Sequence, residues 1–290
     1  MIPSMKRLPM FRSGMCIAFL AAGFIAPKVH AEDYTKSFSV SNRANVHVDT
    51  NDGSVTVIAG DAKQVEFRVE YRGYEVDKTL HIEAHQSGDD IELSARVVNR
   101  LQFAFGNVRK VHIEVRMPKE ADLRVETGDG SIKAGGLSGN IDLHSGDGSL
   151  KVDSLAGIVR LRTGDGSIDA SDLDGRCEAI SGDGRIRLTG RFDALLAKSG
   201  DGRLDVNALH GSKLESDWNI SSGDGAVEVA LPSDLSADID ASTHDGHIST
   251  DIPITVAGII GKSHVRGKLN GGGRSFTIHT GDGSIHLRQS

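Results

Sequence analysis

Cysteine, proline and aromatic residues are all scarce in this chain. Two cysteines, Cys16 and Cys177, and six prolines occur among 290 residues, and aromatic side chains make up 4%. Small disulfide-stapled folds need several cysteine pairs, so that class is excluded. Long apolar runs are missing as well. Beyond Ala31 the best candidate, IPITVAGII from Ile252, has nine residues and is too short to cross a bilayer as a helix.

The N-terminal segment, Met1 to Ala31, has the layout of a secretory signal peptide. Lys6, Arg7 and Arg12 precede the uncharged apolar run of residues 14–26, and Val29 and Ala31 are small residues where signal peptidase cleaves. We expect a signal peptide over residues 1–31, with cleavage after Ala31. A lipid anchor on Cys16 is disfavoured because the preceding residue is not small. The mature protein is then exported to the periplasm, the cell surface or the medium.

Basic residues are also in the minority. The chain has 33 Lys and Arg, of which four lie before the expected cleavage point, so 29 remain against 40 Asp and Glu. An acidic exported protein does not have the charge of a nucleic-acid binder.

What the chain has in abundance is one repeated phrase, Gly-Asp-Gly preceded by Ser or Thr. Five of its aspartates follow one another at a constant interval of 18 in the sequence numbering: Asp129, Asp147, Asp165, Asp183 and Asp201. Three more follow at gaps of 23, 21 and 37: Asp224, Asp245, where His244 stands in place of the first glycine, and Asp282. A strict period of this size is typical of stacked structural units. The last gap is close to two periods, which suggests a coil that has lost its signature.

Aligning the repeats on the aspartate predicts the anatomy of one coil. Apolar residues stand six and four positions before it, as with Ile141 and Leu143, and three and five positions after it, as with Leu150 and Val152. This period of two indicates a strand on each side of the Gly-Asp-Gly corner. A Leu-x-Gly sequence then supplies the next bend. Opposite charges alternate at an outward position of successive coils (Arg124, Asp142, Arg160, Glu178), which favours in-register stacking.

We therefore predict an all-β fold, a parallel β-solenoid (β-helix) with coils of about 18 residues and a right-handed coil sense. Residues 120–290 form the repeat solenoid. Residues 32–119 have strand character without the exact period, and we expect them to form an N-terminal β section that caps the first open edge. Residues 32–290 are then one continuous domain.

Several passages resemble a known bacterial family of β-strand-repeat envelope proteins. They are VRMPKEADLRVETGDGSIKA and the ending VRGKLNGGGRSFTIHTGDGSIHL, and the resemblance extends over residues 38–287. The family is known as putative adhesins and as a domain of unknown function. The resemblance implies a solenoid fold and contacts at the cell envelope, and it supplies no catalytic residues.

The recurring aspartate has two interpretations. In the structural one, the flanking glycines adopt positive φ, the Asp bonds the backbone of its own turn, and the inward Ser or Thr closes the corner. In the other, Asp129, Asp147, Asp165, Asp183 and Asp201 form a Ca²⁺ ladder. The opposite corner carries no recurring acid, however, whereas calcium needs six to eight oxygen ligands. We favour the structural interpretation and expect no cofactor.

The remaining features suggest binding rather than catalysis. A polysaccharide-active β-helix enzyme would need acids and bases outside the repeat, and only Asp217, Asp251, His264 and Arg266 qualify. The apolar stretch LQFAF, with Leu101, Phe103 and Phe105, either packs over the first coil or forms an interaction patch. We expect a non-catalytic scaffold, an adhesin or envelope interaction protein. Its partner is an envelope protein or polysaccharide, or a second copy at the open coil ends.

Overall fold

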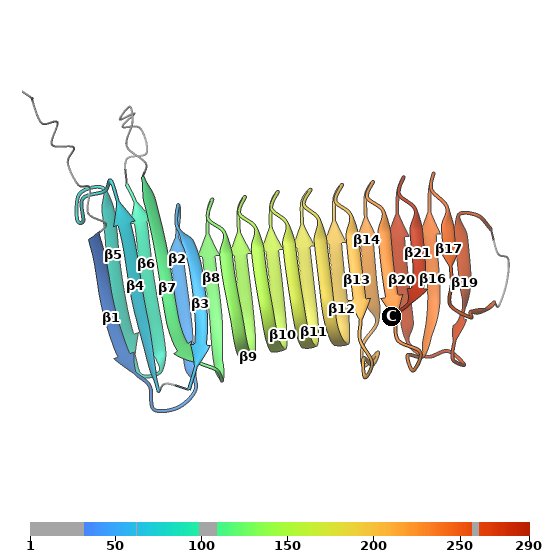
Figure 1. The fold of residues 1–290 in the computed structure, drawn as a ribbon, viewed down its shortest axis with the longest axis horizontal. Coiled ribbons are helices and arrows are strands. Elements are labelled where there is room, and N and C mark those ends of the chain that lie inside the picture. The colour runs from blue at the N-terminus through green and yellow to red at the C-terminus, as the bar shows by residue number, and fades with distance from the viewer. Residues whose placement is uncertain (1–31, 62, 99–108, 257–260) are drawn as a thin grey trace, which may run out of the picture. The chain divides into compact units, whose positions relative to one another are not determined.

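The computed structural model describes residues 32–61, 63–98, 109–256 and 261–290, and throughout these residues the fold is all-β. It contains 21 strands hydrogen-bonded into one continuous sheet that winds around the core (Figure 1). This confirms the predicted β-solenoid. Leu101, Phe103 and Phe105 lie outside the described residues, as does the predicted signal peptide.

The central coils repeat with one irregularity. Each strand pairs in parallel with the next one a sequence period later, so Leu150 lies opposite Ile168 and Leu161 opposite Ala179. The register shifts by one residue where 173–175 pairs with 190–192 and then returns. Strands β9 to β12 continue through the Leu-x-Gly bend, and each therefore contributes to both faces of the stack. The strands are β8 (Ala121–Thr127), β9 (Ile132–Ser145), β10 (Leu150–Thr163), β11 (Ile168–Ser181) and β12 (Ile186–Ser199).

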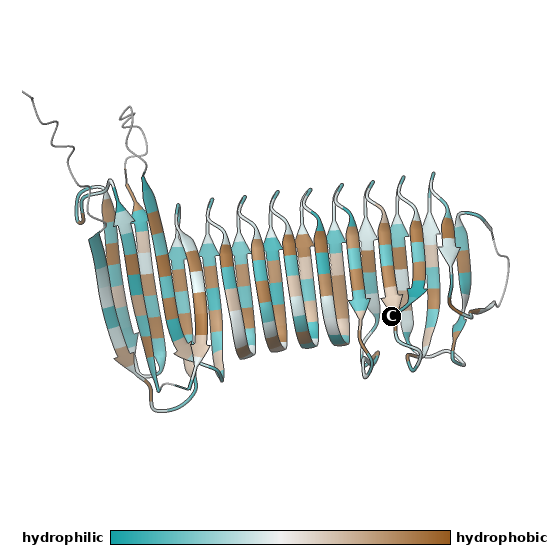
Figure 2. Ribbon diagram, viewed as in Figure 1, coloured by the Kyte–Doolittle hydropathy of each residue, from teal (hydrophilic) through white to brown (hydrophobic). Residues whose placement is uncertain are grey.

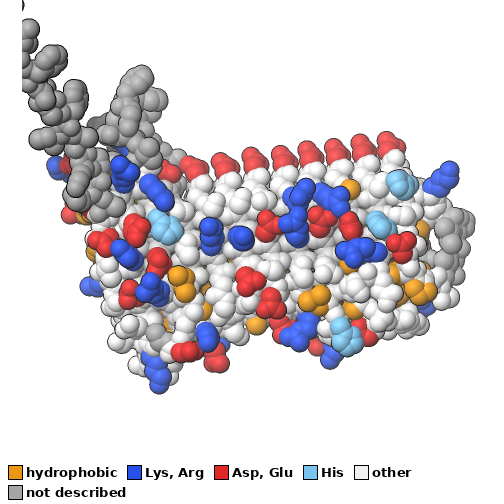
Figure 3. Space-filling model, in the orientation of Figure 1, with side chains coloured by type: hydrophobic (Ala, Val, Ile, Leu, Met, Phe, Trp, Pro, Cys, Tyr) orange, Lys and Arg blue, Asp and Glu red, His pale blue; other side chains and the backbone are white. Residues whose placement is uncertain are grey.

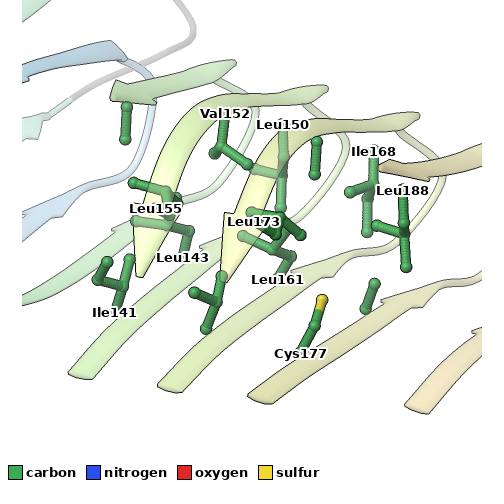
Figure 4. Packing of buried hydrophobic residues seen from close by; sticks show 14 of the residues in the cluster. Ile141, Leu143, Leu150, Val152, Leu155, Leu161, Ile168, Leu173, Cys177 and Leu188 are labelled. Atoms are coloured by element: carbon green, nitrogen blue, oxygen red, sulfur yellow. The ribbon is translucent and has the colours of Figure 1, made fainter. Parts of the chain in front are cut away.

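Alternation of apolar and polar residues builds the core. Brown and teal bands alternate along the strands in Figure 2, and the apolar residues are the buried ones. Ile141, Leu143 and Leu161 are almost fully buried and stack on their counterparts in neighbouring coils (Figure 4). Trp218 occupies the same kind of position, and its indole packs edge-on against Phe276 at a centroid distance of 5.5 Å.

The N-terminal section extends the same stack. Strand β2 pairs in parallel with β8, and β3 with β9, so β2 and β3 form a coil beside the first regular repeat. Strands β6 and β7 form the next coil outward, and β5, β4 and β1 cover this end by antiparallel pairing. The strands are β1 (Glu32–Ser39), β2 (Ala44–Thr50), β3 (Ser54–Gly60), β4 (Gln64–Arg72), β5 (Leu80–Ser87), β6 (Asp90–Val97) and β7 (Lys110–Pro118).

The C-terminal section departs from chain order. Strands β20 and β21 form the last coil of the sequence, yet β20 lies between β14 and β16, and β21 between β15 and β17. The strands are β13 (Leu204–Ala208), β14 (Trp218–Ser222), β15 (Val227–Leu231), β16 (Ala237–Thr243), β17 (Ile248–Thr250), β18 (Thr255–Val256), β19 (His264–Leu269), β20 (Ser275–Thr280) and β21 (Ile285–Gln289).

This arrangement corrects the interpretation of the long gap between Asp245 and Asp282. The prediction of a coil that had lost its signature is wrong. Strands β18 and β19 lie in this gap, and β19 runs antiparallel along β16. The chain then returns and inserts its last coil one place further in, so the spacing reflects an excursion rather than a degenerate repeat.

Candidate functional site: the aspartate row

The corners between paired strands place one aspartate per coil in a straight row. Figure 3 shows a line of acidic side chains along the edge where Figure 1 shows the turns. Strand pairing sets their order, and every one of these side chains is exposed. In stack order the aspartate row is Asp129, Asp147, Asp165, Asp183, Asp201, Asp224, Asp282 and Asp245.

The row has one further member, Asp52, that the regular interval does not include. Asp52 follows β2 in the turn Thr50-Asn51-Asp52-Gly53, and Thr50 lies opposite Thr127 in the sheet. The turn therefore stacks next to the corner that carries Asp129. The signal was present in the sequence, because Thr-x-Asp-Gly keeps three of the four residues of the repeated phrase.

Beneath the row runs a ladder of buried hydroxyl groups. In every coil from Asp129 onward the Ser or Thr two positions before the aspartate donates to the carbonyl of a glycine in the neighbouring corner, as Ser199 Oγ does to Gly184 O at 3.0 Å, whereas the buried Thr50 Oγ1 beside Asp52 has no such partner among the described residues. The same oxygen accepts a bond from its own turn, here from Gly202 N at 3.0 Å. Equivalent donors are Thr127, Ser145, Thr163, Ser181, Ser222, Thr280 and Thr243. The predicted hydroxyl ladder is confirmed.

The glycines serve a different purpose from the one predicted. None of those flanking the row aspartates has a positive φ, so the expectation of left-handed corners is wrong here. Successive corners instead lie in direct contact, with Gly182 N only 2.5 Å from Gly164 O. A Cβ on Gly202 would overlap the carbonyl oxygen of Gly184. Glycine is required because the corners stack too closely for any side chain.

The carboxylates of the row are not used to form the turns. For Asp147, Asp165, Asp183 and Asp201, the described residues include no hydrogen bond from an N–H of the turn to the carboxylate; at the corners of Asp147, Asp183 and Asp201 the Ser hydroxyl accepts the turn N–H instead. The expected Asp-to-backbone bond is therefore wrong at these corners. Stacked about 4.8 Å apart, adjacent carboxylates repel by roughly 0.9 kcal/mol at the dielectric of water.

The geometry gives little support to a metal ladder. Among residues 32–61, 63–98, 109–256 and 261–290, no three His, Cys, Asp or Glu side chains are grouped so as to hold a metal ion. Each coil supplies one carboxylate to the row, and the acids at the other end of the strands, such as Asp153 and Asp172, already accept bonds from Ser154 and Ser171. A Ca²⁺ ion between two corners would have to complete its shell with water and backbone oxygens.

The outward faces beside the row carry ion pairs that cross from coil to coil. Arg162 on β10 bridges Asp142 on β9, at 3.5 Å, and Glu178 on β11, at 2.8 Å. The predicted column of alternating charges is in register, but Arg124 pairs with Glu126 of its own strand. The prediction was correct about stacking and wrong about that partner.

The opposite face is lined by polar side chains over two shallow hollows. One, of about 380 Å³, includes Lys151, Asp153 and Ser171. The other, of about 280 Å³, includes Asn207 and Glu228, and the two hollows share Arg187 and Thr189. Together they give this face a continuous surface of hydrogen-bonding groups.

The pKa values of Glu228, on an outward face, and of Cys177, in the core, are both shifted. A hydrogen bond from Arg288 lowers the pKa of Glu228, and the positive charge of Arg203 acts in the same direction, while partial burial opposes both. Glu228 thereby links β21 to the segment that leads into β13, with contacts of 2.8 and 2.6 Å. Burial, with a smaller effect of Glu178, raises the pKa of the Cys177 thiol to about 12.

The candidate catalytic residues do not converge on one point. His264 and Arg266 both contact Asp240 on β16, whereas Asp251 bonds His286 on β21 at 3.0 Å. Asp217 accepts a bond from the backbone of Ser275. The four groups fall into three separate clusters, and in each cluster they are engaged in ion pairs or hydrogen bonds with neighbouring residues.

The chain matches a family model over residues 43–288, described as Toastrack DUF4097. It belongs to the Toastrack DUF4097 family. This confirms the resemblance drawn from the sequence. No curated protein matches the chain.

Among solved structures, this Toastrack protein is similar to three bacterial proteins at low identity. A putative adhesin from Parabacteroides merdae is 10% identical, with a TM-score of 0.48 over 88% of this chain and 96% of that one. A putative lipid binding protein from Parabacteroides distasonis is 14% identical, with a TM-score of 0.47 over 89% and 98%. A putative cell adhesion protein from Clostridium sporogenes is 14% identical, with a TM-score of 0.31 over 90% and 100%. Likeness at this distance carries no argument about function.

Proposed function

We propose that this Toastrack protein is a non-catalytic, exported scaffold that contacts a partner at the cell envelope, in the manner of an adhesin. The aspartate row and the two polar faces are its contact surfaces, and the partner is an envelope protein or polysaccharide. Export is inferred from the signal-like residues 1–31. Within the described residues, no helix is long and apolar enough to cross a membrane.

One observation carries this proposal: at Asp147, Asp165, Asp183 and Asp201 the carboxylate recurs although it does not close the turn. The turns are closed by Ser and Thr hydroxyls and by glycine contacts, so asparagine or serine at the aspartate positions would form the same corner. Aligned carboxylates also repel one another. These exposed carboxylates recur in each coil, reduce stability and do not close the turn. Contact with a binding partner explains why they are present.

A regular stack suits this role. Quasi-one-dimensional repeat folds present long surfaces on which equivalent side chains recur at each unit. Here the interval is one strand separation, about 4.8 Å. A partner with its own linear repeat, such as a polysaccharide strand or a β-rich protein surface, can meet several coils at once and add their contributions.

The test is binding of the purified protein to envelope preparations, with a charge-matched control. The row variant replaces Asp147, Asp165, Asp183 and Asp201 with asparagine. The control neutralises four exposed acids elsewhere: Asp61→Asn, Glu75→Gln, Glu83→Gln and Glu120→Gln. Both variants gain four units of net charge, so only position differs.

We expect the row variant to lose most of its binding and the control to keep it. Protease and periodate treatment of the envelope then separate a protein partner from a polysaccharide. Equal binding by both variants would refute the role of the row. A third variant with Leu101, Phe103 and Phe105 replaced by serine tests the apolar stretch in the same assay.

Two other functions make distinct predictions. If the row binds Ca²⁺, EDTA lowers the melting temperature and added Ca²⁺ restores it, an effect that the row variant abolishes. If the protein is a polysaccharide-active enzyme, incubation with envelope polysaccharide releases reducing or unsaturated ends, and replacing Asp251 or His264 stops the release. A scaffold shows neither effect.

A further inference from the structure

The C-terminal coil, residues 275–289, fills a slot whose two walls come from earlier residues. Strands β14 and β15 form one wall, and β16 and β17 form the other (Figure 1). Each wall presents a strand edge on both faces of the stack. Both walls of the slot therefore precede, in the sequence, the coil that fills it.

The contacts inside the slot are those of every other coil in the stack. Thr280 Oγ1 donates to Gly225 O at 2.9 Å, and Thr243 Oγ1 donates to Gly283 O at 2.8 Å. Phe276 packs on Trp218 and is fully buried. These bonds do not depend on the connection between the coil and β19, so a coil of the same sequence from another chain can form them equally well.

The connection itself is short and rich in glycine. Asn270 Nδ2 donates to the carbonyls of Ser233 and Leu235, at 2.7 and 2.8 Å, which anchors the start of the link. Gly271 and Gly272 then have φ values of 88° and 89°, and a Cβ on Gly271 would have no atom within 4 Å. Straightening the link beyond Asn270 breaks the bonds from Gly272 N to Leu269 O, at 3.0 Å, and from Gly273 N to Asp238 Oδ1, at 3.2 Å, but it loses no packing at Gly271.

We propose that the slot accepts the C-terminal coil of a second copy of this chain, so that copies exchange this coil as they fold. A second copy is the occupant because the slot matches the inward spacing of this coil. Two outward histidines of the coil also find partners on the far side: His279 bonds Ser242, and His286 bonds Asp251. Reciprocal exchange gives a closed dimer, and sequential exchange gives an open chain.

Exchange takes place during folding rather than afterwards. Phe276, Ile278, Ile285 and Leu287 are all buried in the finished stack, so release of the coil exposes four core side chains and four strand edges. Copies that fold side by side meet the empty slot before this burial occurs. The proposal concerns the slot alone and is independent of what the aspartate row binds.

The test uses full-length chains with Cys16→Ala and Cys177→Ala and one new cysteine each. Asn219 on β14 and Thr277 on β20 are outward neighbours across the slot wall. Chains with Asn219→Cys are refolded together with chains carrying Thr277→Cys, and a short bismaleimide is added. Exchange places the two thiols side by side and yields a covalent pair of chains.

The control pair is Lys133→Cys and Lys151→Cys, which are exposed neighbours across two coils that follow chain order. Its yield measures chance collision. We expect the slot pair to exceed it several-fold and to increase with protein concentration during refolding. One chain carrying both Asn219→Cys and Thr277→Cys must cross-link internally, which shows that the slot is filled and the thiols react.

A hinge variant sharpens the test. Gly271→Val strains the closed link through its positive φ alone and favours the open link on the order of tenfold. Gly88→Val introduces the same strain in the turn between β5 and β6, where a Cβ also meets no atom. The yield across chains should rise in the first variant and stay unchanged in the second. Yields equal to the control pair, with internal cross-linking intact, would overturn the proposal.

Discussion

Removing one hydroxyl from the ladder under the aspartate row should destabilise the whole stack. Ser199 is 2% exposed, donates to Gly184 O and accepts from Gly202 N. In Ser199→Ala the side chain keeps its shape but leaves the buried N–H of Gly202 without a partner. An unsatisfied buried group of this kind costs about 1–3 kcal/mol.

The effect is large enough to measure by thermal unfolding. A loss of 1 kcal/mol lowers the melting temperature by roughly 2–4 °C in a domain of 150–250 residues. The matched control is Ser131→Ala, an exposed serine that directly follows a Gly-Asp-Gly corner, for which we expect a change within about 0.5 kcal/mol. Ser199→Thr should keep the ladder, because Thr127 and Thr163 occupy the same place in other coils.

Chemical denaturation gives the same comparison in free energy, with the slope expected to be unchanged. If Ser199→Ala unfolds at the same midpoint as Ser131→Ala, the hydroxyl ladder adds nothing to stability. The closing of the corners would then have to be attributed to the glycine contacts alone.

Three further outcomes follow from the same geometry. Gly202→Ala should destabilise by about 1–3 kcal/mol or more, because its Cβ overlaps a neighbouring carbonyl, whereas Gly60→Ala, with open space around it, should be close to neutral in the same denaturation assay. Because the pKa of Glu228 is lowered on folding, the ionised carboxylate stabilises the fold at pH values above the ordinary pKa of 4.5, and this contribution is lost as the pH falls through the lower pKa of the folded state. The difference in melting temperature between wild type and Glu228→Gln should therefore be largest near neutrality and vanish in acid. Cys177, with its pKa raised to about 12, should resist thiol reagents at pH 8 until denaturant is added; rapid labelling of the native protein would show that this part of the core opens.

Much of the fold could be predicted because every coil packs its side chains in the same way. The constant interval between the aspartates fixes the register, and the alternation of two around each corner fixes which side chains enter the core. Leu143 and Leu161 are buried for this reason, and Thr163 lies inward by the same parity. Repetition makes a single strand assignment valid for every coil.

The remaining features depend on distances that a sequence does not show. The separation between corners decides why glycine flanks Asp201, and sequence reasoning assigned this to backbone angle instead. The rotamer of Arg124 decides whether it pairs along or across strands. The insertion of β20 and β21 could not be inferred either. Every coil has a similar sequence pattern, so the residues of one coil do not indicate which other coil it pairs with.

The position of that last coil has a consequence for how the molecule is completed. Among the described residues, strands β14 and β15 are joined to β16 and β17 by strand pairing only through β20 and β21. These two parts therefore close into one stack only once the residues from Ser275 onward have been made. A nonsense mutation just before Ser275 would open a gap inside the stack instead of shortening its tip.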